Sequence, residues 1–598
     1  MAAEASGHAP PGGAAEVLRR HAQLLGWQMA SERASFALKV LTGVVGLAAA
    51  IAVVVLIYTS SRHQGLVVQA FSAPPDLVAR GLTGEVLAGD LMDRLVAMQE
   101  DTDSVRAPNS YAIDWSDGTE VEIPQTGVSI GELRRYLRSW LGNETRISGV
   151  VYRRRDGQLA VTARTGGTAG QTFIGPEEEL DGLMRQAAES VYARTQPYRY
   201  TVYLRDQDRA AEAEPIWRTA DQYGEPESLW IVRGWGIHLR LNGDPHGALE
   251  KFRWVQERAP AMGPLYQTIA DAEAVLGRAE ASYQARLRSG RLIARSPDVD
   301  PARREDYAAE EAALLALVRH DVREVERGIG RGTARTGLCE FELMRWDLAA
   351  AERDLAERAS TPDQASMTEY DGARLSLARE DFANALARLD ETAALMNPLT
   401  AALLRTPVTG PTRIDALIGL GRAVEARSFA ASLPNDCYFC VIGRAKAAEA
   451  LGDRAAADRD FARADAMAPS LADAPYQWAR ALLARGDTAG AIRRLTEARR
   501  RAPGWPDPLK VWGDALLARG DAGGAIRKYK AAAELAPRWG ALNVAWARAL
   551  DRQGRRDQAA ARYRFARGLV LTDADRAEVD RRLGASNPSP PAPAAPAP

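Results

Sequence analysis

The sequence predicts a mainly α-helical protein, in which a solenoid of repeated helical hairpins follows one transmembrane helix and a small α/β domain. Three observations lead to this prediction. Residues 40–58 carry no charge over 19 positions. Residues 60–197 alternate between strand-like and helix-like patterns. In the second half glycine recurs at a constant interval of 34 residues, at Gly452, Gly486, Gly520 and Gly554.

Other residue types keep the same period and explain how each repeat would pack. Alanine stands five residues after each glycine, and a large residue stands nine after it: Phe461, Leu495, Tyr529 or Tyr563. Small residues let two helices approach, glycine ends the first helix, and a proline stops the second. The pattern resembles the tetratricopeptide repeat (TPR) family, whose stacked hairpins form a solenoid with binding surfaces for other proteins.

Weaker copies of the repeat lie earlier in the chain. The positions that continue it are Gly243, Gly277, Trp346, Glu380 and Gly421. The spacings between Gly277 and Trp346 do not fit the period. We predict roughly nine or ten hairpins between residues 198 and 585. A Pro/Ala-rich tail at residues 586–598 is expected to be disordered.

The uncharged run is long enough to cross a membrane. As a helix it would span about 28 Å, and we assign residues 37–59 to one transmembrane helix. A cleaved signal peptide is the alternative, but 39 residues precede this run and its apolar core is longer than such peptides have. Gly46 and Ala50 lie four residues apart, a spacing that lets two spans pair as a homodimer, although ordinary lipid-facing residues show it too.

Basic residues set the expected orientation of this helix. The four that precede the run are Arg19, Arg20, Arg33 and Lys39, and the first two after it are Arg62 and Arg80. Positive residues stay on the cytoplasmic side, so residues 1–36 are expected to be a short cytoplasmic segment. The rest of this Arg- and Ala-rich chain would then lie in a bacterial periplasm, with the helix in the inner membrane.

Residues 60–197 have the pattern of a small α/β domain. In order, they predict a strand at 66–71, helices at 84–98 and 130–140, a hairpin of strands at 147–152 and 159–163, and a helix at 176–194. Asp156 and Gly157 form the hairpin turn. This order resembles the TolB-like N-terminal domain family, through Phe71 closing the first strand, Gly81 before the helix and Gly149 in the hairpin.

Two further patterns in this domain have ordinary explanations. Residues 166–172 are rich in glycine and threonine but lack the lysine of a phosphate-binding loop, so a plain loop is expected. The arginines at 153–155 are expected in a solvated turn, with an anionic docking surface as the alternative.

The cysteines are the strongest candidates for chemistry. Cys437 and Cys440 are spaced as in redox-active motifs, but they open a helix of the repeat, and Cys339 stands alone. A structural disulfide in an oxidising compartment is the favoured interpretation, while two packed thiols, a redox site and half a metal site remain alternatives. The six histidines are scattered without metal-ligand spacing, so no metal or cofactor is expected.

The TPR resemblance implies a binding groove lined by the first helix of each hairpin. The family's ligand-facing positions correspond here to Tyr476, Arg480, Lys510, Asp514, Arg548 and Arg552. Arginine and tyrosine often supply the energy of an interface, although each residue could also be an ordinary surface residue. Trp478, Trp512 and Trp546 have the offset of core residues that face the partner helix.

These expectations define a function without catalysis. A net charge of −1 argues against nucleic acid as the main partner, and no constellation of side chains indicates an enzyme. The sequence predicts a membrane-anchored scaffold that binds a protein or peptide in the groove. The alternative is a sensor that passes binding information to a separate cytoplasmic partner.

Overall fold

The structure is a computed structural model that describes two compact units. The described residues are Leu47, 66–109, 111–113, 145–296, 299–330, 338–359 and 364–584. Unit 1 comprises Met1–Asp101 and Pro108–Gln196, and unit 2 comprises Thr102–Ala107 and Pro197–Pro598. Except for Leu47, the expected transmembrane helix at 37–59 lies outside the described residues, as do the helix at 130–140 and the tail at 586–598. Among the residues that are described, no helix has both the length and the apolar character needed to span a membrane.

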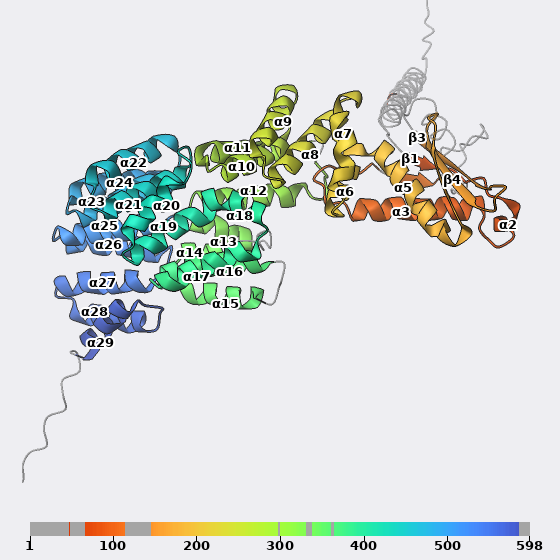
Figure 1. Ribbon diagram of the computed structural model, residues 1–598. Coiled ribbons are helices and arrows are strands. Elements are labelled where there is room, and N and C mark those ends of the chain that lie inside the picture. Colours follow the sequence, from red (N-terminus) through yellow and green to blue (C-terminus); the bar gives the residue numbers. More distant parts are fainter. Residues whose placement is uncertain are drawn as a thin grey trace, which may run out of the picture. The chain divides into compact units, whose positions relative to one another are not determined.

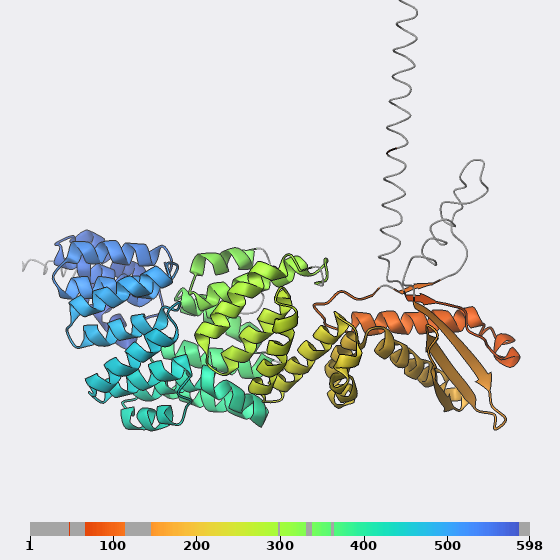
Figure 2. The same ribbon diagram turned by 90° about the horizontal axis from the view of Figure 1, so that it is seen from above.

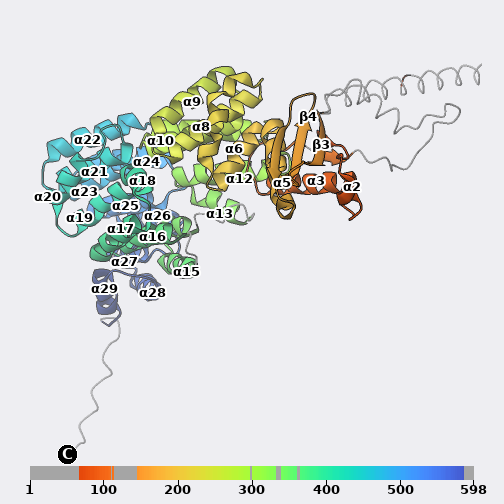
Figure 3. The same ribbon diagram turned by 45° about the vertical axis from the view of Figure 1, so that its right-hand side comes forward.

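Unit 1 is a five-stranded sheet with helices. Its elements are β1 (Leu66–Val68), α2 (Pro75–Val78), α3 (Gly84–Glu100), β2 (Tyr111–Ile113), β3 (Thr145–Arg153), β4 (Leu159–Thr165), β5 (Gln171–Gly175) and α5 (Leu180–Thr195). The strand order is β2-β1-β3-β4-β5, with β1 parallel to both of its neighbours and the β3-β4-β5 pairs antiparallel. Helix α5 packs on β4, on β5 and on α3 (Figure 3).

The expected hairpin has a clear local cause. Gly157 adopts a φ of +83°, which glycine tolerates best, and the strands pair with Gly149 opposite Ala163. A β-carbon on Gly149 would lie 2.1 Å from the ring of Phe71, so this strand needs glycine where the phenylalanine crosses it. Beneath the sheet, Leu91 of α3 and Ala187 of α5 are fully buried.

Two strands of unit 1 differ from the sequence interpretation. The loop expected at 166–172 ends in β5, because Gln171 and Thr172 pair with Ala163 and Thr162. Strand β2 is only three residues long. Both are short strands at the edges of the sheet, and only Gly175 of β5 is buried, so neither produces a clear apolar pattern in the sequence.

Unit 2 is a helical solenoid whose hairpins we number 1 to 10. It begins with α6 (Pro197–Asp206) and α7 (Glu214–Arg218). Hairpins 1 to 5 are α8 (Glu227–Leu241) with α9 (Pro245–Arg258), α10 (Gly263–Val275) with α11 (Ala279–Ile293), α12 (Arg304–Val318) with α13 (Val322–Gly330), α14 (Leu338–Met344) with α15 (Leu348–Arg358), and α16 (Ala365–Ala378) with α17 (Phe382–Leu395) (Figure 1).

Five further hairpins follow. Hairpin 6 joins α18 (Pro398–Leu404), a π-helical segment at Arg405–Thr409 and α19 (Gly410–Gly419) to α20 (Ala423–Ala431). Hairpins 7 to 10 are α21 (Tyr438–Ala450) with α22 (Arg454–Met467), α23 (Asp473–Ala484) with α24 (Thr488–Arg501), α25 (Pro506–Ala518) with α26 (Ala522–Ala533), and α27 (Gly540–Arg552) with α28 (Arg556–Arg567), and α29 (Asp573–Gly584) follows. In Figure 2 this part of the chain runs from blue-green to blue. Ten hairpins within the described ranges agree with the count that the sequence predicts.

One backbone motif ends the first helix of each hairpin. The break residue has a positive φ in all ten, and seven of the breaks are glycines: Gly243, Gly277, Gly421, Gly452, Gly486, Gly520 and Gly554. The other three breaks are His320, Trp346 and Glu380, with φ values of 51°, 59° and 62°. Trp346 and Glu380 were expected there, whereas His320 was missed.

An aspartate directly after the break often begins the second helix. Asp487 and Asp521 accept hydrogen bonds from the backbone N–H groups of Gly490 and Gly524, at 2.8 and 2.7 Å. Such caps satisfy an otherwise unpaired donor of the first helical turn. The same residue type follows His320, where Asp321 accepts from the N–H of Glu324 at 3.3 Å.

Unit 2 winds back on itself, so that hairpins 1 to 4, which we call its first turn, contact hairpins 6 to 10, which we call its second turn. The breaks of hairpins 1 to 4 contact segments at the N-terminal ends of the first helices of hairpins 6 to 10. Gly243 faces Leu399 at the start of α18, and the carbonyl of Gly277 accepts from the N–H of Tyr438 at 2.9 Å. We call this line of contacts the seam, and it joins residues more than 150 positions apart.

Candidate partner-binding face

A row of charged residues follows the first helices of the hairpins. Six residues before each break stands a charged side chain in eight of the ten hairpins. This charge row consists of Asp271, Glu340, Arg374, Asp415, Lys446, Arg480, Asp514 and Arg548. Because equivalent positions of stacked hairpins share one face, the row runs along the solenoid. Four of the eight members lie in hairpins 7 to 10, where the repeat is clear in the sequence, and only Arg480, Asp514 and Arg548 belong to the site that the TPR resemblance implies. The row as a whole was therefore not predicted.

Neighbouring members of the charge row neutralise one another. Arg374 contacts Glu340 of the preceding hairpin at 3.4 Å, and the ammonium group of Lys446 is paired with Asp415. Asp271 is paired at 2.7 Å with Arg286 of its own hairpin. These pairs join consecutive first helices or the two helices of one hairpin, so they leave little free charge for a partner.

The expected site residues in hairpins 9 and 10 are also engaged by their own chain. Lys510 contacts Asp514 at 2.9 Å, and Asp514 accepts a hydrogen bond from Tyr529 at 2.8 Å. Arg552 donates to the carbonyl of Leu517 at 2.8 Å.

Arg548 is held by the last helix. Its guanidinium contacts Asp575 at 2.9 Å and Glu578 at 2.6 Å, both on α29. The hydrogen bond to Glu578 has the largest effect on Arg548 and raises its pKa further above the ordinary value. Asp575 adds to this shift. The charged C-terminal helix therefore covers the groove position that sequence reasoning assigned to a partner.

Tyr476 lies in the wall of the solenoid. Only 7% of the residue is exposed, its ring packs at 4.5 Å on that of Trp505, and its hydroxyl is 3.5 Å from a carboxylate oxygen of Asp507. Burial raises the pKa of this hydroxyl, and the neighbouring Asp507 adds to the shift. Tyr476 therefore shapes the site from beneath.

Arg480 differs from every other member of the charge row. Across the described ranges it is the one member without an ion pair, and its guanidinium donates only to the side-chain oxygen of Gln477, at 3.2 Å. It is exposed and lies 5.9 Å from the ring centre of Tyr476. Tyr476, and more weakly Asp415 and Asp507, raise the pKa of Arg480. The guanidinium is therefore charged, held over an aromatic ring and open to a ligand.

The tryptophans of the repeat face the second helix of their own hairpin. Each is covered by a cation that lies 16 residues further along the chain. The ring centres of Trp478, Trp512 and Trp546 are 3.6, 3.5 and 3.7 Å from the charged groups of Arg494, Lys528 and Arg562. This placement fits the sequence interpretation of a packing role, and the cation–π contact adds to each hairpin.

The cysteine pair is joined in a disulfide. Cys437 and Cys440 are both fully buried, and the sulfur of Cys440 lies 3.2 Å from the carbonyl oxygen of Thr406 in the π-helical segment of hairpin 6. Cys339 is a free, buried thiol whose pKa is raised to about 12 by burial. Among the described residues no cluster of three histidine, cysteine or acidic side chains could hold a metal.

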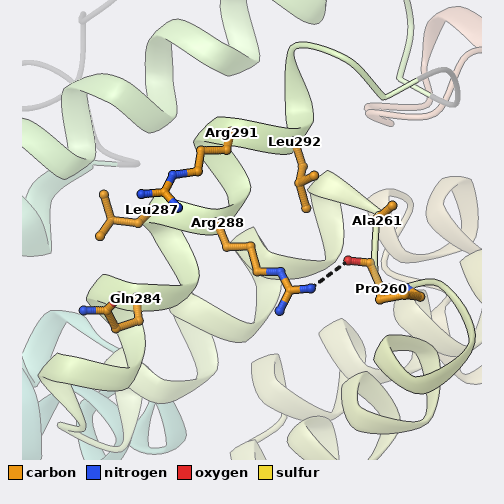
Figure 4. Close-up of a pocket in the computed structure, with 7 residues that line it drawn as sticks. All are labelled: Pro260, Ala261, Gln284, Leu287, Arg288, Arg291 and Leu292. Atoms are coloured by element: carbon orange, nitrogen blue, oxygen red, sulfur yellow. Dashed lines mark hydrogen bonds between the residues drawn. The ribbon is translucent and has the colours of Figure 1, made fainter.

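A separate hollow lies beside α11. It has a volume of about 680 Å³ and is lined by Pro260, Ala261, Gln284, Leu287, Arg288, Arg291 and Leu292 (Figure 4). Arg288 packs 4.3 Å from the ring centre of Tyr266 and donates to the carbonyl of Pro260 at 3.1 Å. These contacts explain the position of Arg288 as part of the hairpin's own packing.

The chain matches no known protein family and no curated protein. It is similar to the crystal structure of yeast Tom70, with 14% identity over 68% of this chain and 96% of that one and a TM-score of 0.31. The Cut9 and Hcn1 hetero-tetramer of the APC/C gives 10% identity over 68% and 94%, with a TM-score of 0.33. The class of protein, a helical-repeat solenoid that resembles TPR proteins, therefore rests on its own hairpins and breaks.

Proposed function

We propose that this protein is an interaction scaffold that binds an acidic segment of a protein or peptide partner at Arg480, without catalysing a reaction. The observation that supports the proposal is the unpaired state of Arg480 in a row whose other described charges are paired. A guanidinium forms two parallel hydrogen bonds with a carboxylate, and the ring of Tyr476 holds it in place.

Arg480 is therefore the member of the charge row that gains most from a partner. The other members of the expected site would have to give up an existing ion pair or hydrogen bond before they could bind a carboxylate. Arg480 gives up only the bond to Gln477. Hot-spot arginines of interfaces commonly contribute about 2 kcal/mol or more.

Charge reversal tests this proposal. In Arg480→Glu the partner's carboxylate meets a negative charge, so capture of partners by crosslinking and mass spectrometry on native membranes should fall at least about tenfold. Arg459→Glu, on the exposed side of α22, is the matched control and should retain capture. Equal capture by both variants, with unchanged circular dichroism melts, would sink the assignment.

We further propose that residues 37–59 anchor the scaffold in the bacterial inner membrane, with the N-terminus cytoplasmic and the remainder periplasmic. The charge bias around the uncharged run supports this orientation, and a disulfide suits an oxidising compartment. Alkaline phosphatase fused after residue 585 should be active, and activity only of an N-terminal fusion would reverse the orientation.

The cysteines offer a second test of the compartment. Thiol labelling of denatured protein, prepared without reductant, should modify Cys339 and leave Cys437 and Cys440 protected until reduction. Labelling of all three would show that no disulfide forms. A sensor function and a homodimer through the membrane helix are the finer alternatives, and a cytoplasmic protein crosslinked to residues 1–36 only when a periplasmic partner is bound would favour the sensor.

A further inference from the structure

One contact in the seam contains a histidine, the side chain whose ordinary pKa lies closest to neutral pH. His320, the break of hairpin 3, lies between the N-terminal ends of α23 and α25. Its Nε2 is 3.1 Å from a carboxylate oxygen of Asp473, and its ring stacks at 4.0 Å on that of Trp505 with an angle of 13° between the planes. The imidazole thus joins residues of hairpins 8 and 9 to hairpin 3, across more than 150 positions of the chain.

The charged groups around the imidazole are acidic. Asp473 of α23, Asp507 of α25 and Glu340 of α14 all act on it, while Trp505 is neutral. Two helix N-termini meet here, which alone would disfavour a cation, and the carboxylates in their first turns reverse that effect. Burial by itself would lower the pKa of His320, but Asp473, with smaller contributions from Asp507 and Glu340, raises the pKa above its ordinary value.

We propose that His320 is a proton-dependent clasp that holds the two turns of the solenoid together. In its protonated form the imidazolium makes a charged hydrogen bond to Asp473, while in its neutral form the same atoms make a weaker one. This proposal goes beyond partner binding at Arg480 and does not depend on it.

The direction of the effect follows from the charges. Because the imidazolium is favoured in the folded protein, the contribution of the clasp is complete below the pKa of an unfolded histidine. It is lost as the pH rises through the higher pKa of the folded state. The seam is therefore tight in acid and looser in mild alkali.

The rest of the seam does not share this behaviour. The ring of Trp346, the break of hairpin 4, stacks at 4.5 Å on Trp539, and its indole N–H donates to Asp507 at 3.1 Å. Arg538 contacts Asp347 at 3.0 Å. Neither the indoles nor the guanidinium changes charge near neutrality, so the seam loosens locally at hairpin 3.

Hydrogen exchange of the full-length protein tests the clasp. Rates at about pH 5.5 and about pH 8.5, corrected for the intrinsic pH dependence of exchange, should differ severalfold in peptides that cover residues 318–326 and 470–480. In His320→Asn the new side chain tolerates the positive φ but cannot become positively charged. It should exchange fast at both pH values.

Two variants separate the clasp from other causes. Trp346→Asn, at the neighbouring break, leaves His320 and Asp473 in place and should therefore keep the pH difference at 470–480. Glu311→Gln removes another titrating group of hairpin 3 and should keep the pH difference at 470–480. Wild-type rates that do not change with pH, or a pH difference that persists in His320→Asn or disappears in Glu311→Gln, would overturn the proposal.

Discussion

The regular hairpins 7 to 10 and the irregular hairpins 1 to 4 use the same positive-φ break for different purposes. In the regular hairpins the break is always glycine, and a β-carbon added at Gly452, Gly486, Gly520 or Gly554 would meet no atom within 4 Å. In hairpins 1 to 4 the break faces another turn of the solenoid. The comparison teaches that glycine supplies only the backbone conformation, whereas a side chain at the break can also hold the seam.

The irregular breaks illustrate the balance of these two effects. A residue with a β-carbon in the left-handed region costs about 1–2 kcal/mol. His320 and Trp346 offset this cost with ring stacking and hydrogen bonds to the second turn. Glu380 makes no contact of this kind in the described structure and is exposed.

The largest expected effect contrasts two glycine breaks. Gly277→Ala places a β-carbon 2.7 Å from the sulfur of Cys437 and strains a φ of 75°, so we expect about 3 kcal/mol of destabilisation from strain and overpacking together. Gly520→Ala meets only the strain at a φ of 82° and should lose about 1 kcal/mol. Urea unfolding followed by circular dichroism measures both, and equal losses would contradict the distinction.

A second pair of variants replaces the residue at two breaks without glycine by glycine. Trp346→Gly relieves the backbone but removes the stacking on Trp539 and leaves Asp507 without the indole donor, so a net loss of about 2 kcal/mol is expected. Glu380→Gly relieves the backbone alone and should gain up to about 1 kcal/mol. Stabilisation by both replacements, in the same unfolding assay, would show that the contacts of Trp346 in the seam do not stabilise the fold.

We expect a group in the irregular hairpins to make the stability of the protein depend on pH. The carboxyl group of Glu311, on α12, is fully buried beside Arg286, and burial raises its pKa to about 7 from an ordinary 4.5. When folding raises the pKa of an acid in this way, the protein loses stability as the pH rises from the pKa of the unfolded state to that of the folded state. Glu311→Gln should therefore gain on the order of 2 kcal/mol at pH 8 relative to pH 4, measured by urea unfolding at both. Arg286 keeps its contact with Asp271 in this variant, and a gain that is equal at both pH values would contradict the assignment.

Sequence periodicity predicted the hairpins where local residues determine them. Glycine, alanine and aromatic residues recur at fixed offsets in the regular half because each hairpin packs small residues against large ones. Gly513 illustrates this packing, since a β-carbon there would lie 2.3 Å from the ring of Tyr529. The break at His320 was missed because it lies 43 residues after Gly277 and 26 before Trp346, outside the 34-residue period, although the capping Asp321 was an available signal.

The candidate site was less predictable than the fold. The TPR-derived positions included Arg480, but the sequence did not show that Arg548 would be covered by α29 or that Tyr476 would be buried. The pairing of Arg374 with Glu340 depends on neighbouring hairpins whose register the sequence left open. Contacts of the seam join residues that are far apart along the chain, and no local pattern reports them.

The most direct test of the two-turn solenoid is a double-mutant cycle on Trp346 and Trp539. Their rings are nearly parallel, 4.5 Å apart with 4° between the planes, although 193 positions separate them in the sequence. Replacing each by alanine, singly and together, measures their coupling in urea unfolding, with Trp346 and Trp478 as a control pair that should be additive. We expect a coupling energy of about 1 kcal/mol. A coupling indistinguishable from that of the control pair would show that the second turn does not rest on the first.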